Sequence, residues 1–258
     1  MSLSESKTIF ITGASSGIGE ACAIRFAREG YSLILNARRK ERIDELADML
    51  KKDFGAKVWK LVFDVRDKET VFNEIALLPE DWKNIDVLIN NAGLALGLSD
   101  LHDGDTEDWE QMIDTNVKGL LYVSKAVIPG MIERKKGQII NIGSIAGKET
   151  YLKGNVYCAT KHAVDSLSKA MRMELLPYNI RVSLVNPGAT NTEFSQVRFK
   201  GDKERADGIY KGYKPLSGDD IARCILFCAE LPEYININDM LIMPTAQAAA
   251  GLFNKEND

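Results

Sequence analysis

Tyr157 and Lys161 are two side chains whose types and spacing could carry out acid–base chemistry. They are four residues apart in a segment with helical periodicity, so they share a helix face about one turn apart. A free phenol titrates near ~10, and one positive charge about 4 Å away contributes ~4 kcal/mol at an effective dielectric constant of ~20. That charge could lower the phenol pKa by up to about three units before desolvation opposes it. The pair predicts a tyrosine that exchanges a proton with a reacting hydroxyl or carbonyl, and an ordinary surface pair is the alternative.

A glycine-rich turn follows the first apolar run, in the order Thr12-Gly13-Ala14-Ser15-Ser16-Gly17-Ile18-Gly19. Gly13 permits a sharp turn, Gly17 lets the backbone approach a pyrophosphate, and Gly19 permits close packing of a helix on a strand. The free N–H groups and the dipole of the helix that follows would hold the phosphates. Strand, turn and helix in this order predict a dinucleotide site. A glycine turn without a ligand is the alternative.

Basic residues follow the second apolar run, at the position that selects the nucleotide. That run ends in Asn36-Ala37-Arg38-Arg39-Lys40, and the first acidic residue, Glu41, lies beyond it. NAD sites place Asp or Glu here to bind the ribose 2′-hydroxyl, whereas an arginine accommodates the 2′-phosphate of NADP. Arg38 and Arg39 therefore favour NADP over NAD, with a solvated basic turn as the alternative.

Strand-length apolar runs alternate with amphipathic segments along the chain. The predicted strands are residues 8–11, 32–37, 58–63, 87–90, 138–142, 181–185 and 240–243. The predicted helices are residues 19–28, 40–54, 68–77, 106–132, 156–176 and 219–229. Nearly continuous apolar runs are typical of strands covered on both faces, and their alternation with helices predicts right-handed βαβ units. We predict an α/β fold, with one Rossmann-type doubly wound domain over residues 1–258 and a mostly parallel seven-stranded sheet flanked by helices on both faces.

Two segments depart from this alternation. Residues 191–215 are polar and glycine-spaced with no strand of their own, and long irregular segments in compact domains are often functional. We expect them to form a lid over the substrate. Residues 117–132 are apolar on more than one face and interrupted at Pro129-Gly130, which predicts packing on the sheet and on another subunit.

The composition excludes several classes of protein. The chain has 258 residues, 33 Lys and Arg against 37 Asp and Glu, and a net charge of −4, which argues against binding nucleic acid. Two histidines, His102 and His162, cannot form a three-histidine metal site, and the four cysteines contain no paired C-x-x-C. No apolar run approaches the ~18 residues of a membrane helix. We expect a soluble, cytoplasmic protein with a small-molecule substrate and no metal, nucleic-acid or membrane partner.

The chain resembles the short-chain dehydrogenase/reductase family over essentially its whole length. The residues that carry the resemblance follow the family's order and spacing, and they are Thr12–Gly19, Asp64-Val65, Asn90-Asn91-Ala92-Gly93, Asn116, Ser144, Tyr157-Cys158-Ala159-Thr160-Lys161 and Pro187-Gly188. The resemblance implies that Tyr157 is the general acid/base and that Lys161 lowers its pKa and binds the nicotinamide ribose. It also implies that Ser144 orients the substrate oxygen and that Asn116 holds a water in a proton relay.

The same resemblance implies the cofactor contacts. Asp64 and Val65 flank the adenine, Asn91 lies along the cofactor, and the 187–195 loop holds the nicotinamide carboxamide with Thr192 as a donor. The predicted cofactor-binding residues are Gly13, Ser15, Ser16, Gly17, Ile18, Gly19, Arg38, Arg39, Asp64, Val65, Asn91, Tyr157, Lys161, Pro187, Gly188 and Thr192. Many NADP-preferring members carry a basic residue where this chain has Ser16, so the NADP prediction depends on Arg38 and Arg39.

Three stretches resemble a narrower group, the NADP-dependent 3-hydroxy acid dehydrogenases. These are residues 90–97, 192–201 and 235–238. Members of the group oxidise serine and L-allo-threonine and reduce malonic semialdehyde, and family members are commonly tetramers. The resemblance thus implies an NADP-dependent oxidoreductase acting on a small 3-hydroxy acid, as a homo-oligomer. The alternatives are reduction of a 3-oxoacyl thioester or another carbonyl, and a catalytically silent NADP(H) sensor.

Arg198 lies after the nicotinamide loop, in the predicted lid. A 3-hydroxy acid brings a carboxylate whose burial requires a partner, and an arginine fork donates two parallel hydrogen bonds to such a group. We expect the substrate to contact Ser144, Tyr157 and Arg198. The alternative is a lid arginine that pairs with Glu193 or faces water, in which case Lys153 or Lys200 would take the carboxylate.

Overall fold

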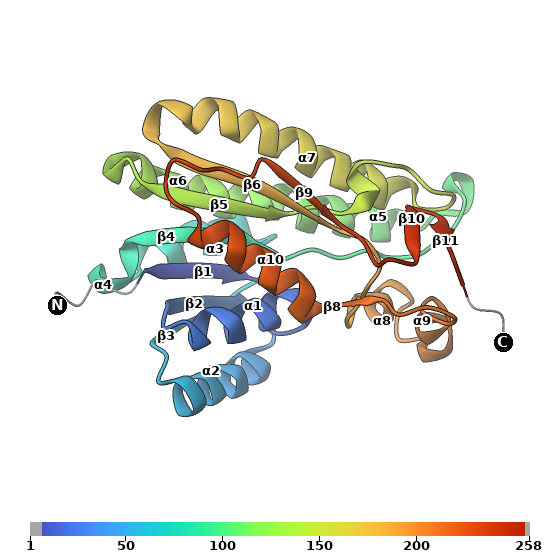
Figure 1. Cartoon of the computed structure of the whole chain (residues 1–258), viewed down its shortest axis with the longest axis horizontal. Helices are drawn as coiled ribbons and strands as arrows, with labels where there is room; N and C mark the ends of the chain where they lie inside the picture. Colours follow the sequence, from blue (N-terminus) through green and yellow to red (C-terminus); the bar gives the residue numbers. More distant parts are fainter. Residues whose placement is uncertain (1–6, 256–258) are drawn as a thin grey trace.

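The central sheet contains seven parallel strands in the order β3-β2-β1-β4-β5-β6-β9 (Figure 1). The computed structural model describes residues 7–255. The strands of this sheet are β1 (Thr8–Thr12), β2 (Ser32–Ala37), β3 (Val58–Val62), β4 (Ile85–Asn90), β5 (Gly137–Ile142), β6 (Ile180–Pro187) and β9 (Asp239–Ile242). The predicted seven-stranded doubly wound sheet is confirmed. The predicted domain limits within 1–6 and 256–258 lie outside the described residues.

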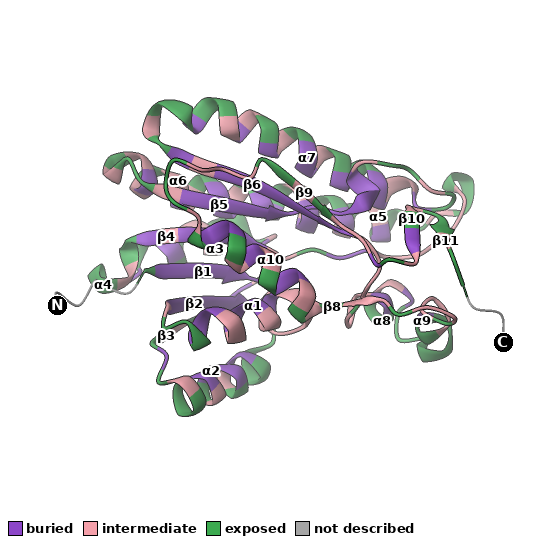
Figure 2. Cartoon of the chain, in the orientation of Figure 1, coloured by how far each residue is buried: buried purple, intermediate pink, exposed green. Residues whose placement is uncertain are grey.

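Helices cover both faces of the sheet, because successive strand residues point to opposite sides. In β1, Ile9 and Ile11 pack on the layer that contains α1 (Gly17–Arg28), α2 (Lys40–Phe54) and α10 (Gly218–Glu230). Phe10, between them, packs on the layer that contains α3 (Lys68–Ala76), α6 (Leu120–Arg134) and α7 (Asn155–Leu175). Figure 2 shows strands β1, β2 and β5 buried and the outer sides of the helices exposed.

The predicted helix 106–132 is three consecutive segments. These are α5 (Thr106–Ile113), a π-helical turn (Asp114–Gly119) and α6. The predicted interruption at Pro129-Gly130 is wrong, since α6 continues through Pro129 to Arg134. Met131, on the turn after the proline, is fully buried, and this burial holds the helix in place across the missing N–H.

The lid segment 191–215 contains two short helices, α8 (Phe194–Arg198) and α9 (Lys203–Gly208). Its first residue belongs to β7 (Thr190–Asn191), which pairs with β8 (Leu216–Ser217). The expectation that the segment has no strand is therefore wrong at Asn191. The pairing of β7 with β8 ties the two ends of the lid together.

Shorter elements complete the fold. They are α4 (Glu80–Lys83), the single turns Leu101–Asp103, Ile145–Gly147 and Leu176–Tyr178, and the hairpin of β10 (Gln247–Ala249) and β11 (Leu252–Phe253). Within residues 7–255, no helix is long and apolar enough to cross a membrane. Because all seven strands of the main sheet are parallel, their carboxyl ends meet at one edge, where a doubly wound fold binds its ligand.

Candidate active site

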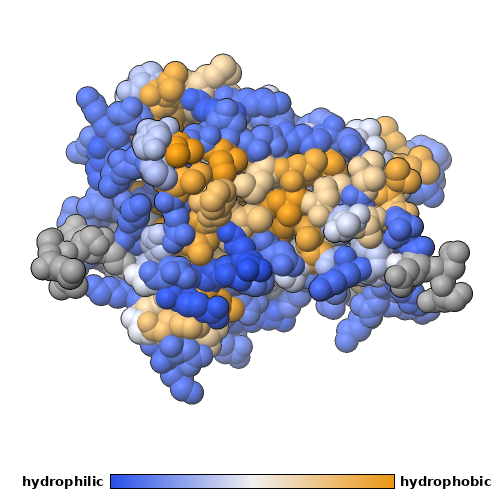
Figure 3. Space-filling view, viewed as in Figure 1, coloured by the Kyte–Doolittle hydropathy of each residue, from blue (hydrophilic) through white to orange (hydrophobic). Residues whose placement is uncertain are grey.

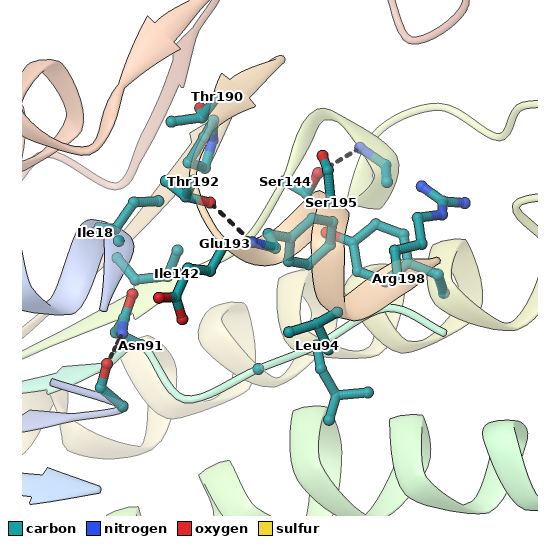
Figure 4. A pocket seen from close by; sticks show the side chains of 18 of the residues that line it. Ile18, Asn91, Leu94, Ile142, Ser144, Thr190, Thr192, Glu193, Ser195 and Arg198 are labelled. Carbon is teal, nitrogen blue, oxygen red and sulfur yellow. Dashed lines mark hydrogen bonds between the residues drawn. The ribbon is translucent and has the colours of Figure 1, made fainter. Parts of the chain in front are cut away.

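A cavity of about 590 Å³ opens at the carboxyl edge of the sheet. Its lining includes the glycine turn after β1, the residues after β2 to β6, and the lid. In Figure 4, Ile18 and Asn91 lie toward one end of this cavity and Ser144 and Arg198 toward the other. A volume of this size suits a small-molecule site.

The glycine turn brings α1 close to β1 and β4. Gly13 and Gly17 have φ angles of 64° and 59°, in the left-handed region that favours glycine. A Cβ on Gly19 would lie 2.3 Å from the Gly13 carbonyl oxygen, so the predicted packing role of Gly19 is observed. Gly19 is buried behind the turn, whereas Ser15, Ser16, Gly17 and Ile18 line the cavity.

Asn91, which follows β4, holds the glycine turn through hydrogen bonds. Its Nδ2 donates to the carbonyl oxygens of Thr12 at 2.9 Å and Gly13 at 3.1 Å. Asn91 lines the cavity, and its amide is engaged by the backbone of the turn. Ser16, the N-cap of α1, makes no side-chain cap bond. The first N–H groups of α1 thus remain available beside the cavity, as an anion site requires.

The predicted 2′-phosphate arginines have different surroundings. The Arg38 side chain is 59% exposed, and its Nη1 lies 3.6 Å from Asp64 Oδ2. Arg39 donates from Nη2 to Ser15 Oγ at 3.1 Å and from Nη1 to Glu193 Oε2 at 3.0 Å. Both arginines line the same end of the cavity.

Asp64 and Val65 line the cavity after β3. Burial disfavours the Asp64 carboxylate, but hydrogen bonds from the side chain and backbone of Arg66 outweigh it and hold the pKa of Asp64 below its usual value. Val65 packs against Gly119, where a Cβ would lie 2.7 Å from Val65 Cγ2. This contact fixes one wall of the cavity.

Ser144, Tyr157 and Lys161 meet at the other end. Ser144 follows β5, and its backbone N–H donates to Asn186 Oδ1 at 3.1 Å. α7 carries Tyr157 and Lys161, with the Lys161 Nζ 6.0 Å from the centre of the Tyr157 ring. That Nζ donates to the Ile142 carbonyl oxygen at 2.9 Å. The structure thus brings together the three residues that the sequence analysis expected at one site.

Burial sets the ionisation of this pair. It raises the pKa of the Tyr157 phenol, with Tyr151 adding to the effect and a hydrogen bond with Ser144 and the charge of Arg198 opposing it. Burial also lowers the pKa of Lys161 to about 8. The predicted lowering of the Tyr157 pKa by Lys161 is wrong for the chain by itself. The charge of Lys161 is not among the causes of the shift, and burial, which disfavours the phenolate, is the largest of them.

Asn116 lies in the π-helical turn, behind the cavity wall. Its Nδ2 donates to the Leu94 carbonyl oxygen at 2.8 Å and to Thr160 Oγ1 at 3.0 Å, and its Oδ1 accepts from the Leu94 N–H at 2.8 Å. Asn116 Oδ1 and Lys161 Nζ are both close to Gly93, since a Cβ there would lie 3.2 and 3.6 Å from them. Asn116 therefore adjoins Lys161 through Gly93.

Arg198 projects from α8 into the catalytic end of the cavity (Figure 4). Its Nη1 donates to the Tyr151 hydroxyl at 2.9 Å, and its Nε donates to the Gly97 carbonyl oxygen at 3.1 Å. The guanidinium carbon lies 5.7 Å from the centre of the Tyr157 ring. The expected alternative, pairing with Glu193, is wrong, because Glu193 pairs with Arg39 and Arg42.

The two substitutes for Arg198 are engaged by carboxylates. Lys153 lies 3.6 Å from Asp100, and Lys200 lies 2.9 Å from Asp108 and 3.3 Å from Asp105. Neither lysine lines the cavity. Of these three side chains, Arg198 alone lines the cavity.

The loop predicted to hold the nicotinamide, residues 187–195, lies over the glycine turn. Pro187 ends β6 and Gly188 follows it at the cavity wall, and Gln247 of β10 accepts from the Ala189 N–H at 2.7 Å. A Cβ on Gly17 would lie 3.1 Å from the Thr192 Cβ, so Thr192 contacts the turn directly. The start of the lid thus closes this side of the cavity.

Sequence reasoning assigned no role to Tyr151 and paired Glu193 with a different arginine. Tyr151, which precedes α7, holds Arg198, and Glu193, which precedes α8, bridges two arginines. Neither has a spacing signal, because each acts on a residue distant in sequence. Among residues 7–255, no group of three or more His, Cys, Asp or Glu side chains is arranged to hold a metal ion.

Comparisons with known proteins agree with this geometry. The family model described as short chain dehydrogenase matches residues 7–203. The chain is 46% identical over 245 residues to NADP-dependent 3-hydroxy acid dehydrogenase YdfG of Salmonella typhi, covering 95% of this chain and 97% of that protein. It is 45% identical over 251 residues to the NADP-dependent 3-hydroxy acid dehydrogenase of Schizosaccharomyces pombe, covering 97% of each.

A solved structure has the same architecture. The closed form of serine dehydrogenase complexed with NADP⁺ superposes with a TM-score of 0.91 and 43% identity, over 97% of this chain and all of that one, 100%. Serine dehydrogenase from Escherichia coli gives a TM-score of 0.81 and 39% identity, over 93% of this chain and 99% of that one.

Proposed function

The chain belongs to the short chain dehydrogenase family, and from that premise we propose that it is an NADP-dependent oxidoreductase of hydroxy acids. Hydride passes between NADP(H) and the hydroxyl or carbonyl carbon of a small 3-hydroxy acid such as serine, L-allo-threonine or 3-hydroxypropionate. The observation that carries the proposal is Arg198, which lies 5.7 Å from the Tyr157 ring in the same cavity. A substrate whose carboxylate binds Arg198 would have its hydroxyl-bearing carbon, C3, beside the Tyr157 phenol.

The residues at the glycine-turn end of the cavity fit a dinucleotide with a 2′-phosphate. Gly13 and Gly17 in the left-handed region leave a cradle beside the uncapped start of α1, where pyrophosphate oxygens can accept from backbone N–H groups. Arg38 and Arg39 lie where the 2′-phosphate is expected. Bound NADP supplies the hydride acceptor or donor and, when oxidised, a positive charge near Tyr157.

The side chains of the catalytic end perform the proton transfer. Ser144 and Tyr157 form a hydrogen-bonded pair that would hold the substrate oxygen between their hydroxyls. In reduction Tyr157 donates its proton to the carbonyl oxygen, and its raised pKa keeps that proton in place beforehand. In oxidation the phenolate form of Tyr157 would take the hydroxyl proton. The positive charges of Lys161, Arg198 and bound NADP⁺ would favour that form over the neutral phenol. We assign the relay of that proton toward solvent to Asn116, which adjoins Lys161.

Replacing Arg198 tests the substrate assignment. Arg198→Ala should lower kcat/KM for serine by ~2–5 kcal/mol, since it leaves a buried carboxylate unpaired. Oxidation of a neutral secondary alcohol should scarcely change. Arg205→Ala is the matched control, because Arg205 lies on the same lid with its guanidinium over Phe199. Equal losses for acid and alcohol would mean that Arg198 holds the lid and not the carboxylate.

Replacing the basic pair tests the cofactor assignment. Arg38→Ala/Arg39→Ala should weaken NADP binding by ~1.5–3 kcal/mol per lost charged hydrogen bond and leave NAD binding nearly unchanged. The measurement is titration of protein fluorescence with each nucleotide. Equal weakening for NADP and NAD would place the action of the arginines elsewhere.

We also propose that the enzyme works in the cytoplasm as a homo-oligomer, as the resemblance implies. Leu121 of α6, on the predicted subunit face, is 37% exposed, which supports the proposal. Sedimentation of the purified protein measures the state directly.

A further inference from the structure

Glu193 joins the lid to the adenosine end of the cavity. Its Oε2 accepts from Arg39 Nη1 at 3.0 Å, and its Oε1 accepts from Arg42 Nη1. The partners are 154 and 151 residues away in sequence, at the start of α2. In Figure 4 the Glu193 carboxylate is directed away from Arg198. One carboxylate of the lid therefore bridges two arginines on the opposite side of the cavity.

These contacts engage every nitrogen of the Arg39 guanidinium. Nε and Nη2 donate to Ser15 Oγ at 3.3 and 3.1 Å, and Nη1 donates to Glu193. An arginine fork binds carboxylate and phosphate with the same donor geometry. A 2′-phosphate that binds Arg39 must then share the Nη1 nitrogen with Glu193, or displace Glu193 or Ser15 from the guanidinium.

Glu193 is ionised in this cluster. Burial disfavours its carboxylate, but hydrogen bonds from Arg42 and Arg39 outweigh it and hold the pKa of Glu193 below its usual value. Glu20, in the first turn of α1, has a raised pKa because of burial and then because of the negative charge of Glu193. The field of the Glu193 carboxylate thus extends to the start of α1, beside the predicted phosphate positions.

We propose that Glu193 determines the degree of cofactor preference: its carboxylate competes with the 2′-phosphate of NADP for Arg39. The inference rests on the proposed function, in which Arg38 and Arg39 receive that phosphate. NAD has a hydroxyl in place of the 2′-phosphate, so Glu193 does not compete with it for Arg39. Glu193 therefore reduces the difference between the affinities for NADP and NAD. Because Glu193 binds Arg39 again as NADP leaves, it also increases the rate of NADP release.

The substitution Glu193→Gln removes the charge and keeps the size of the side chain. The dissociation constant of NADP, from calorimetry or protein fluorescence, should fall by about three- to fivefold, which is the upper range for a partly exposed ion pair. The dissociation constant of NAD should stay within about twofold, and NADP release followed by stopped flow should slow by the NADP factor. Glu204→Gln removes an exposed carboxylate from α9 of the same lid and should change neither constant.

A double-mutant cycle locates the competition at Arg39. In an Arg39→Ala background, Glu193→Gln should change NADP affinity less than it does when Arg39 is present, because the shared guanidinium is gone. Unchanged or weaker NADP binding in the Glu193→Gln single variant overturns the inference and makes Glu193 a residue that orients Arg39. Unchanged NADP affinity in the Arg39→Ala single variant overturns the role proposed for that arginine, and the two failures are thereby distinguished.

Discussion

Tyr157 and Lys161 are both buried, and burial shifts their pKa values in opposite directions. The phenol pKa is raised and the ammonium pKa is lowered to about 8, because burial disfavours the charged form of each group. At the residue scale, burial thus favours the neutral form of both groups. The proton transfer by Tyr157 and the effect of the buried Lys161 on the free energy of unfolding can be measured separately.

Tyr157→Phe should abolish the proton transfer and leave the fold intact. Turnover should fall by at least ~10²-fold, the lower range for a positioned acid or base, while NADP binding persists. Steady-state absorbance at the nicotinamide band and fluorescence titration measure the two properties. Retained turnover in this variant would contradict the mechanism.

Lys161→Met should stabilise the protein without cofactor while it inactivates the enzyme. The folded-state pKa of about 8 lies below the ordinary 10.5, so between these values the unfolded chain binds more protons and stability rises with pH. Below pH 8 the folded protein bears the full cost of the buried ammonium. The variant should then gain about 1–3 kcal/mol at pH 7, after the loss of the bond to Ile142, and should lose that gain toward pH 10.

Urea unfolding at pH 7 and pH 9.5 measures this gain. A variant that is equally destabilised at both values would show that the hydrogen bond from Lys161 to Ile142 outweighs desolvation.

At the scale of elements, the cradle depends on the contact of α1 with the turn before it and with the segment after β4. Gly19 is the point of closest approach, where a Cβ would lie 2.3 Å from the Gly13 oxygen and 2.5 Å from Asn91 Nδ2. Neither atom can move freely, because Asn91 already bonds the backbone of Thr12 and Gly13. A side chain here would push the helix away from the strand.

Gly19→Ala should therefore weaken NADP binding by at least about tenfold and destabilise the fold by ~1–3 kcal/mol through overpacking. Gly130→Ala is the matched control, since its Cβ would meet only the flexible end of Arg134. The control should keep full binding and gain up to about 1 kcal/mol from helix propensity. Calorimetry and thermal unfolding test both variants, and unaltered NADP affinity in Gly19→Ala would contradict this account of the cradle.

At the scale of the whole molecule, apolar side chains are exposed on two faces. Figure 3 shows apolar groups gathered across the middle of the face on which β9 and α10 lie, where Phe227 is 55% and Leu241 47% exposed. The second face is that of α6, with Leu121 37% exposed. Exposed apolar surface of this kind marks interaction sites.

We expect Leu121→Asp and Phe227→Asp each to lower the mass of the homo-oligomer, because each would bury a charge in a subunit contact. Val62→Asp, on β3 at the opposite edge of the sheet from β9, should leave the mass unchanged. Sedimentation velocity distinguishes the outcomes. A monomeric unaltered protein would contradict the expectation.

Local pattern was enough to predict the fold and, in the cavity, the glycine turn and the pair of Tyr157 and Lys161. Continuous apolar runs identified all seven strands of the main sheet, and the turn from Thr12 to Gly19 has the backbone freedom that its glycines suggest. The Tyr157–Lys161 spacing placed both side chains at one site because four residues make about one helical turn. Such features depend on residues that are close together in the sequence, so they can be predicted from the sequence alone.

Only the tertiary structure decided how distant residues pair. Tyr151 bonds to Arg198, and Glu193 bridges to Arg39, across elements far apart in the chain. The burial that raises the Tyr157 pKa likewise comes from elements distant in sequence. Charge pairing and desolvation depend on distances and on the exclusion of water, and neither is a property of residue spacing. For the same reason, the continuity of α6 through Pro129 became visible only with the core that buries Met131.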